Sequence, residues 1–460
     1  MKKSWYTLFN LLFLLLCTVP LLAMLVLGPS EAAANEVLAS KPVLLTGNGL
    51  NIDFLTQLSD YIGDRFAFRQ ELITANAHLT ASLFRESSAD SVILGKDGWL
   101  YYASTLDDYT GASAMSDREL YRAARTLSLA RSYTESQGAR FLFTVPPNKN
   151  TLYPSQMPDR YPAARQPGNL ERLTLLLKQQ NVPFCDLCAV LSRSDTPVYY
   201  KTDSHWDGYG SALACDALIE CLNGTSRLST EPFTLTDHRG DLYEMLYPAG
   251  TLMEQGRTIS RERTFTYTSP LRAADDLTIR TESSGEMGSL LMFRDSFGNL
   301  LHADLAERFS RAVFIRSTAL RLDLLDGAGT VIFELVERNL PQLLTNPPVM
   351  PAPVRTFTPP ADSIPAEIEW TRQSAPELPG LVRYTARLSL SAPPDVDSPI
   401  YVSLDGTVYE ASPSAPAGQD FTLYAPEATE LQVYIRQGNI WRCCTDLDQH
   451  ESVDYLGDNS

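Results

Sequence analysis

The chain has 460 residues, and its 55 acidic side chains outnumber the 38 basic ones, so the formal net charge is −17 at pH 7. This charge argues against nucleic-acid binding, because phosphate contacts need clustered lysine and arginine. It argues only weakly against a polyanionic substrate, since a local basic cleft can override the global charge. The length exceeds one ordinary domain, and we expect two.

An apolar segment without charged residues extends from Trp5 to about Gly28, after Lys2 and Lys3. It can span a hydrocarbon core, which takes about 20 residues as a helix. It is also longer than the apolar part of most cleavable signal peptides. We predict an uncleaved signal anchor over 1–28 in the cell membrane, with the lysines cytoplasmic and the following domains extracytoplasmic. Cleavage near the alanines at 32–34, and secretion, is the alternative.

Residues 29–52 are small and polar and predict a juxtamembrane linker, and residues 53–345 have the pattern of an α/β domain. Lys-Asp-Gly at 96–98 predicts a tight turn between two strands. From residue 117 onward, predicted helices alternate with short apolar strands, among them 140–145 and 289–293. Such alternation is typical of βαβ units in a mainly parallel sheet.

Prolines cluster before and within residues 346–367, which we interpret as a semi-rigid linker. Residues 368–444 alternate apolar and polar side chains at period two, and predict a β-sandwich that could bind carbohydrate. Packing in the core explains its tyrosines at least as well as stacking on sugars; they are Tyr401, Tyr409, Tyr424 and Tyr434. The acidic tail 445–460 lacks lysine and arginine, so we predict disorder there.

Two short segments carry the chemistry predicted for this chain: Tyr-Lys-Thr-Asp-Ser-His-Trp at 200–206 and Phe-Arg-Asp-Ser-Phe-Gly-Asn at 293–299. Ser296 follows a predicted strand and precedes a predicted helix, where free N–H groups and the helix dipole favour an oxyanion. His205 supplies a base, and Asp203 a carboxylate that orients it. We predict a triad of these three residues; the simpler interpretation is that Ser296 only caps the helix.

Neighbouring residues offer alternatives for these roles. His302 lies on the predicted helix of Ser296 and is expected to point away from it, and Asp295 is expected to shape the turn. The N–H groups of Ser296 and Gly298 are candidate oxyanion donors, because glycine lets the backbone approach closely. Further candidates for oxyanion or substrate contacts are Asn148, Lys149, Trp206, Arg294 and Asn299.

Seven cysteines are present, and Cys185 and Cys188 have the CxxC spacing of zinc and redox sites. No second pair completes a metal site, so free thiols or disulfides are the expectation. We predict no metal and no cofactor for the reaction.

Six segments in this order resemble the SGNH-hydrolase-like superfamily, in the branch of alginate O-acetylation proteins and bacterial DHHW proteins. They are residues 64–69, 94–101, 145–154, 202–206, 293–299 and, more weakly, 331–338. The resemblance implies a three-layer α/β sandwich and the same triad, with the serine after the Asp-x-His pair. It alone implies a membrane-bound O-acyltransferase as acyl donor. Ser204 stands where DHHW proteins carry histidine, and Arg294 where many relatives carry glycine.

We therefore expect an extracytoplasmic O-acetyltransferase that acts on a cell-surface or exported polysaccharide through an acyl-enzyme on Ser296. A carbohydrate acetylesterase would use the same triad, and only its preference for water as acceptor would differ. The alternative from another class is a non-catalytic glycan-binding or scaffold protein of a cell-envelope assembly, in which Ser296 would be dispensable.

Overall fold

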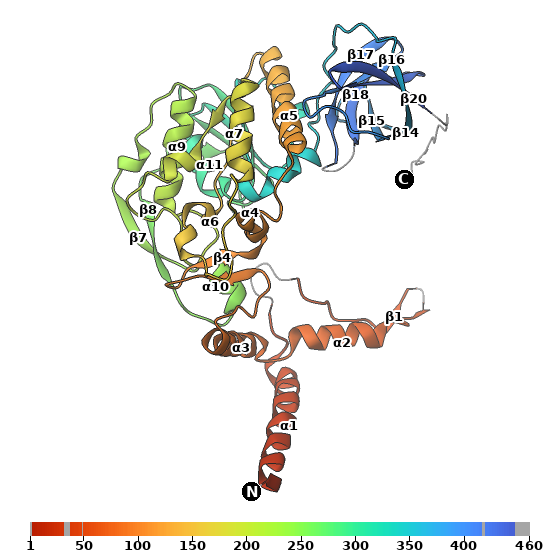
Figure 1. Cartoon of the computed structure of the whole chain (residues 1–460). Helices are drawn as coiled ribbons and strands as arrows, with labels where there is room; N and C mark the ends of the chain where they lie inside the picture. Colours follow the sequence, from red (N-terminus) through yellow and green to blue (C-terminus); the bar gives the residue numbers. More distant parts are fainter. Residues whose placement is uncertain (1, 32–36, 48, 416–418, 447–460) are drawn as a thin grey trace.

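The computed structural model describes residues 2–31, 37–47, 49–415 and 419–446. Figure 1 shows a long N-terminal helix, two helices across its end, an α/β domain and a β-barrel. Helix α1 (Lys2–Leu27) is long and apolar enough, over Trp5–Leu27, to cross a membrane by length and composition. The prediction of an apolar N-terminal helix is thus confirmed.

A seven-stranded sheet forms the centre of the α/β domain, in the order β6-β5-β13-β11-β12-β10-β9. The first five strands are parallel, as predicted, and β10 and β9 add an antiparallel edge. The strands are β5 (Arg140–Thr144), β6 (Phe184–Cys185), β9 (Phe265–Tyr267), β10 (Thr278–Ser283), β11 (Ser289–Arg294), β12 (Arg311–Arg316) and β13 (Thr330–Glu334).

Helices cover both faces of this sheet, because its central strands are apolar on both faces. Leu291 and Phe293 of β11 pack in the core cluster that includes residues of α5 (Asp117–Ser136) and α7 (Asn169–Gln179). Leu290 and Met292 pack on the opposite face with α9 (Gly208–Cys221) and α11 (Gly298–Ala306). The predicted three-layer sandwich is therefore confirmed, and Ser296 lies between β11 and α11.

Two smaller β units and several short helices surround the sheet. The predicted hairpin forms from β3 (Val92–Leu94) and β4 (Leu100–Tyr102), and Asp97 and Gly98 take positive φ at its turn. Within the interval between α9 and β11, β7 (Phe233–His238) pairs with β8 (Glu254–Ile259). The shorter helices include α4 (Leu106–Thr110), α6 (Lys149–Leu152), α8 (Leu187–Leu191), α10 (Asp241–Leu246) and 3-10 turns at Ala103–Thr105, Pro154–Gln156, Leu228–Thr230, Leu322–Leu324 and Glu337–Leu344.

The C-terminal region is all-β, as predicted, and its strands close into a barrel instead of leaving two separate sheets. The long β14 pairs with β15 on one side and with β20 on the other, which removes the free sheet edges. Strand β14 starts inside the segment interpreted as a linker. The strands are β14 (Ser363–Ser374), β15 (Val382–Leu390), β16 (Ile400–Leu404), β17 (Thr407–Pro413), β18 (Phe421–Ala425), β19 (Leu431–Gln437) and β20 (Ile440–Asp446).

The barrel tyrosines are mostly interior. Tyr409, Tyr424 and Tyr434 are buried, whereas Tyr401 is half-buried and stacks on Trp441 with ring centroids 4.8 Å apart. Packing therefore explains three of the four, and carbohydrate binding by this domain stays a prediction. The predicted disorder of the tail falls on 445–460, of which 447–460 lie outside the described residues.

The barrel is joined to the α/β domain through a buried carboxylate on β17. Glu410 accepts hydrogen bonds from Arg125 of α5 at 2.6 and 2.7 Å, and from Arg355 at 2.7 Å. A buried carboxylate with two cationic partners fixes geometry, because removing one partner leaves an uncompensated charge. All seven cysteines are free thiols.

Candidate active site

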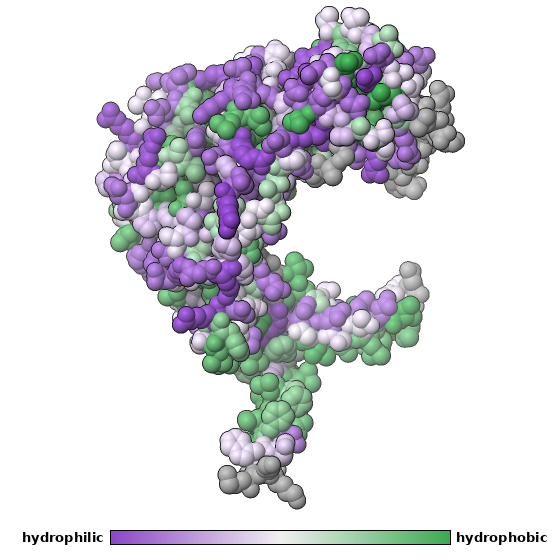
Figure 2. Space-filling model, viewed as in Figure 1, coloured by the Kyte–Doolittle hydropathy of each residue, from purple (hydrophilic) through white to green (hydrophobic). Residues whose placement is uncertain are grey.

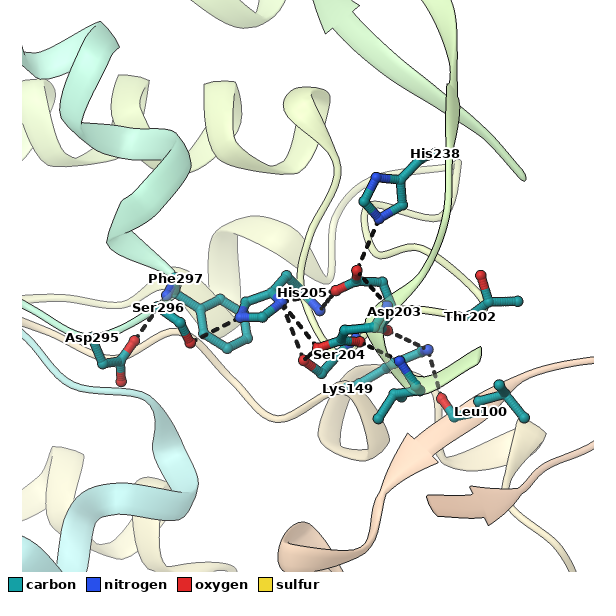
Figure 3. A network of polar contacts seen from close by, with 12 residues as sticks. Leu100, Lys149, Thr202, Asp203, Ser204, His205, His238, Asp295, Ser296 and Phe297 are labelled. Atoms are coloured by element: carbon teal, nitrogen blue, oxygen red, sulfur yellow. Dashed lines mark hydrogen bonds and ion pairs between the residues drawn. The ribbon is translucent and has the colours of Figure 1, made fainter. Parts of the chain in front are cut away.

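The two segments singled out in the sequence meet above the end of β11 (Figure 3). Ser296 Oγ lies 2.8 Å from His205 Nε2, and His205 Nδ1 lies 2.8 Å from Asp203 Oδ1. An ionised carboxylate only accepts, so Nδ1 carries the ring proton and Nε2 is free to accept from the serine hydroxyl. The three side chains thus stand in series, with the geometry that general-base activation of a serine needs.

Local turn chemistry positions Ser296. The carboxylate of Asp295 accepts from the Phe297 N–H at 2.9 Å and from the Val336 N–H at 2.8 Å. The Asp295 N–H donates to Glu334 Oε2 at 3.0 Å. Asp295 therefore shapes the turn, as expected, and its carboxylate faces β13 and the chain after it, away from His205.

Gly298 is required by close packing behind the serine. A Cβ atom at this position would lie 2.7 Å from both Cβ and Cδ of Arg294, and 3.1 Å from Glu334 Oε2. Burial and the neighbouring Asp295 raise the pKa of Glu334 well above its ordinary value.

Two backbone donors remain available beside the serine. Within the described chain, no hydrogen bond uses the N–H groups of Ser296 and Gly298, whereas that of Phe297 is taken by Asp295. Both N–H groups stand at the start of α11, where unpaired donors and the helix dipole favour negative charge. This arrangement can stabilise an oxyanion on a carbonyl attacked by Ser296.

Asp203 is the centre of the histidine loop, residues 200–207. Its Oδ1 accepts from the side chain and N–H of His205, and its Oδ2 accepts from His238 Nε2 at 2.8 Å and from the Asp241 N–H at 3.0 Å. Burial opposes its ionisation, but the hydrogen bonds from the two histidines outweigh that effect and hold the pKa of Asp203 well below its usual range. Asp203 is therefore an anion under all ordinary conditions.

The same carboxylate tunes both histidines. Burial by itself would lower the pKa of His205, but the hydrogen bond and charge of Asp203 outweigh it and raise that pKa above its ordinary value. The balance is the same for His238, whose pKa is also raised. His238 lies on β7 and stacks on Tyr200, with ring centroids 4.0 Å apart. The series of contacts therefore extends to four residues, from Ser296 through His205 and Asp203 to His238.

Lys149, predicted as a substrate or oxyanion contact, has a different position. Its ammonium is buried and donates to the carbonyls of Leu100 at 2.6 Å, Lys201 at 2.7 Å and Asp203 at 2.9 Å. Burial lowers its pKa to about 7, although the nearby charge of Asp203 opposes this. Lys149 holds the histidine loop from below and does not face Ser296 (Figure 3).

The other predicted contact residues are also part of the framework. Trp206 is fully buried and packs edge-on against Phe297, with ring centroids 5.0 Å apart. The buried guanidinium of Arg294 donates to the carbonyls of Ala274 and Asp276 and to the side chain of Asn299. The guanidinium of Arg294 and the side chain of Asn299 are thus engaged within the protein, whereas the indole N–H of Trp206 has no hydrogen-bond partner among the described residues.

Asn148 is likewise committed to the framework. Its side-chain amide donates to Asp108 at 3.1 Å, and its side-chain oxygen accepts from the Arg338 N–H at 3.3 Å. The rival His302 contacts Tyr267 and the carbonyl of Asn299, and does not contact Ser296. Its exclusion from the triad agrees with the geometry.

Sequence reasoning did not find Asp241, His238 and Phe297. Asp241 accepts from the N–H of Ser204 at 2.7 Å and from its hydroxyl at 2.5 Å. Phe297 packs against the ring of His205, with centroids 4.9 Å apart. The first two lie more than thirty residues from Asp203 along the chain, and no local pattern marks them.

Within the described residues, one group could offer three ligand atoms to a cation: Asp203, His205 and Asp241, whose donor atoms lie within 4.8 Å of one another. Each is already hydrogen-bonded to another member, to Ser204 or to a backbone N–H. These bonds account for the clustering, and we assign no metal to it.

Residues 92–278 match the family described as "SGNH hydrolase-like domain, acetyltransferase AlgX". The chain is 25% identical over 185 residues to the "Probable alginate O-acetylase AlgJ" of Pseudomonas syringae pv. tomato, covering 40% of this chain and 46% of that protein. It is 26% identical over 188 residues to the same-named protein of Pseudomonas fluorescens, covering 39% and 46%.

Among solved structures, the chain is similar to Bacillus cereus PatB1 with a sulfonyl adduct, with a TM-score of 0.42 and 15% identity, over 54% of this chain and 97% of that one. The O-acetyltransferase domain of Pseudomonas putida AlgJ aligns with a TM-score of 0.38 and 18% identity, over 55% and 92%. A DHHW family protein from Eubacterium siraeum aligns with a TM-score of 0.39 and 18% identity, over 54% and 91%.

Residues 92–278 of the α/β domain thus match an SGNH hydrolase-like family, and the predicted resemblance to the alginate O-acetylation branch is confirmed. The matched region contains Asp203 and His205 and ends before Ser296. The chain spans less than half the length of the curated relatives it matches.

Proposed function

We propose that the protein is a membrane-anchored O-acetyltransferase that transfers acetyl groups to a polysaccharide outside the cytoplasm. The observation that carries the proposal is the contact series from Ser296 Oγ to His205 and on to Asp203, with 2.8 Å at each step. The match to an acetyltransferase family and the similarity to proteins named alginate O-acetylase support the acetyl group and the polysaccharide.

The first half of the reaction forms an acetyl-enzyme. His205 Nε2 takes the hydroxyl proton as Ser296 Oγ bonds to the carbonyl carbon of an acetyl ester. The carbonyl oxygen becomes an oxyanion, which accepts from the N–H groups of Ser296 and Gly298. As the tetrahedral intermediate collapses, the ester C–O bond breaks, and His205 returns the proton to the departing alcohol.

The second half repeats these steps with a sugar hydroxyl as nucleophile. His205 removes the proton of the acceptor hydroxyl, its oxygen bonds to the acetyl carbon, and Ser296 leaves and regains its proton. Asp203 stabilises the imidazolium that forms in both halves, because it stays ionised. If water replaces the sugar hydroxyl, the same residues make an acetylesterase, so the acceptor separates the two activities.

The cellular setting is part of the proposal. Helix α1 would anchor the chain with its N-terminus in the cytoplasm and the active site on the other side of the membrane. A membrane-bound O-acyltransferase would supply the acetyl group across the bilayer; this step rests on the family resemblance. The acidic surface argues only weakly against an acidic polymer as acceptor.

The test uses the full chain in detergent, a chromogenic acetyl ester as donor, and oligosaccharides as acceptors. Ser296→Ala and His205→Ala are compared with wild type, and Ser136→Ala, at an exposed serine that ends α5, serves as the control. We expect loss of turnover in the first two variants only, and acetyl esters on the sugar in mass spectra. Free acetate as the sole product would assign an esterase, and undiminished turnover in Ser296→Ala would refute the triad.

A further inference from the structure

An amphipathic helix with no fully buried residue lies directly after the N-terminal region. Helix α2 (Phe54–Arg65) contains apolar residues at positions 54, 55, 58, 61 and 62, which fall on one side of a helix. None of its residues is buried, and the side chain of Leu55 is 77% exposed. In a folded protein such a stripe normally packs against the core, whereas the described residues leave Leu55 exposed and the other four apolar side chains only half-buried.

Two neighbouring segments extend this apolar surface. Strands β1 (Leu45–Thr46) and β2 (Gly49–Leu50) form a small hairpin before α2, and helix α3 (Arg69–Phe84) follows it. The large exposed apolar side chains of these segments are Val43, Leu44, Leu45, Leu50, Ile52, Leu55, Leu79, Leu83 and Phe84. We call α2, the hairpin and the exposed side of α3 the platform.

Hydrogen bonds place the platform at the end of α1. The Ser30 N–H donates to the carbonyl of Arg65 at 2.9 Å, and the Ala39 N–H donates to Asp64 Oδ2 at 2.8 Å. The chain leaving α1 is thereby tied to the last turn of α2. In Figure 1, α2 and α3 run across the end of α1, roughly perpendicular to it.

The apolar side of α2 faces the same direction as α1. Figure 2 shows hydrophobic surface along the edge of α2 on the α1 side, continuous with the hydrophobic surface around α3 and α1. A helix that spans a bilayer places its end at the headgroup level, so segments perpendicular to that end lie in the interface. The apolar face of α2, which points in the same direction as α1 extends, would then enter the boundary between headgroups and acyl chains.

We propose that the platform lies in the interface of the bilayer that α1 spans, with the apolar side of α2 among the lipid acyl chains. This inference rests on the proposed anchor. The occupant is lipid, because the exposed apolar surface is continuous with the span itself. Helix α2 has no lysine and carries Asp60 and Asp64 beside Arg65, so attachment comes from apolar burial and does not need anionic lipid.

The platform is mechanically connected to the active site. His78 of α3 stacks on Tyr247, which follows α10, with ring centroids 4.3 Å apart, and Thr74 Oγ1 accepts from the Ala249 N–H at 2.9 Å. Helix α10 begins at Asp241, which binds both Asp203 and Ser204. A bilayer-bound platform would therefore hold the histidine loop at a set height and orientation above the membrane.

The test places one tryptophan on each side of α2 in the full chain, reconstituted into phosphatidylcholine vesicles. Leu55→Trp lies on the apolar side, and Thr56→Trp, exposed and on the opposite side, is the matched control. Emission is compared between vesicles with brominated and with ordinary acyl chains, after subtracting wild type, because Trp5 of α1 is quenched in every sample.

We expect the added emission of Leu55→Trp to be quenched at least about twofold more than that of Thr56→Trp, in neutral and anionic vesicles and at high salt. Ester turnover of both variants verifies that they fold. Equal weak quenching at both positions, in chains that float with the vesicles, would overturn the platform and leave the anchor intact. Equal weak quenching with a doubled particle mass would assign the surface to a second copy.

Failure of the chains to float with the vesicles would overturn the anchor, and with it the platform. The triad would be unaffected, because its ester turnover is measured separately in detergent. The two proposals are thus distinguished by separate readouts.

Discussion

The serine turn and the histidine loop meet at one site, but they differ in how much of their support is local. In the serine turn, residues 294–298, Asp295 caps Phe297 and Gly298 packs on Arg294, and Asp295 also bonds to the chain around β13. In the histidine loop, Asp203 orients His205 locally, and most of the other contacts come from residues far along the chain. The nucleophile thus combines local turn chemistry with contacts to β13, whereas the base depends mainly on tertiary contacts.

Strand β8 and a buried lysine supply many of those distant contacts. Glu254 lies at the start of β8, and its carboxylate accepts from the N–H groups of Lys201 and Thr202 at 2.9 and 3.0 Å. Lys149 binds the loop carbonyls from the other side. Substitutions of residues far along the chain should therefore displace the histidine loop, whereas substitutions within residues 294–298 should displace Ser296 directly.

The largest effect is expected at the centre of the histidine loop. Asp203→Asn keeps the shape but removes the anion that fixes the His205 tautomer and stabilises the imidazolium, so turnover should fall about 10⁴-fold. Steady-state kinetics with the chromogenic ester measures it. Asp237→Asn on β7, which is exposed, is the control and should retain activity. A loss under tenfold at Asp203 would contradict its assignment.

Lys149→Met tests the support beneath the loop. The change leaves the carbonyls of Leu100, Lys201 and Asp203 without their buried donor, so the free energy of unfolding should fall by about 3 kcal/mol or more. Turnover should fall as well, because the Asp203 backbone shifts. Denaturant titration measures the stability of Lys149→Met and of a control, Lys178→Met. Lys178 is exposed on α7, so the control should change stability little. Equal denaturation midpoints for Lys149→Met and Lys178→Met would show that the histidine loop does not need Lys149.

Gly298→Ala tests the serine turn. The new methyl meets Arg294 at 2.7 Å, at a Cβ atom that cannot move away, so the turn must shift and stability should fall by about 1–3 kcal/mol. Gly329→Ala is the matched control, since its nearest neighbours lie at 3.7 Å and beyond. Thermal unfolding and turnover of the two proteins should separate clearly. Indistinguishable behaviour would remove close packing as the reason for this glycine.

The smallest expected effect comes from His238→Gln. Protonated His238 partly cancels the charge of Asp203, so a neutral amide there leaves more of that charge to His205 and raises its pKa further. His205 acts as a base when neutral, and its pKa is already raised in wild type, so the acid limb of kcat/KM should move to higher pH in the variant. Turnover on the alkaline plateau should stay within about threefold. A downward shift would contradict this sign.

Much of the fold followed from periodicity. The parallel strands, the Lys-Asp-Gly hairpin and the all-β C-terminal region could be predicted, because apolar alternation and turn residues are local signals. Barrel closure could not, since it depends on the pairing of β14 with β20, which lie at opposite ends of the domain. The less regular interval 224–285 predicted an insertion with some antiparallel strands, and β9 and β10 lie there, but local patterns could not give their pairing.

At the active site, the residue types and their places in the predicted elements singled out Ser296, His205 and Asp203, because together they supply a nucleophile, a base and the carboxylate that orients it. The same reasoning named Lys149 and Arg294 as candidate substrate or oxyanion contacts, whereas the structure buries both side chains in the framework. Charged side chains are usually solvated, so nothing in the sequence showed that these two would be buried.

By itself, the sequence determined the apolar N-terminal helix, the layers of the α/β domain and the three residues that the proposed chemistry uses. Only the tertiary structure decided how His205 is held, which second histidine shares its carboxylate, and which apolar helix is left uncovered. The physical reason is the range of the forces. Turns and periodicity act over a few neighbouring residues, whereas burial and the pairing of buried polar groups depend on what the folded chain brings together.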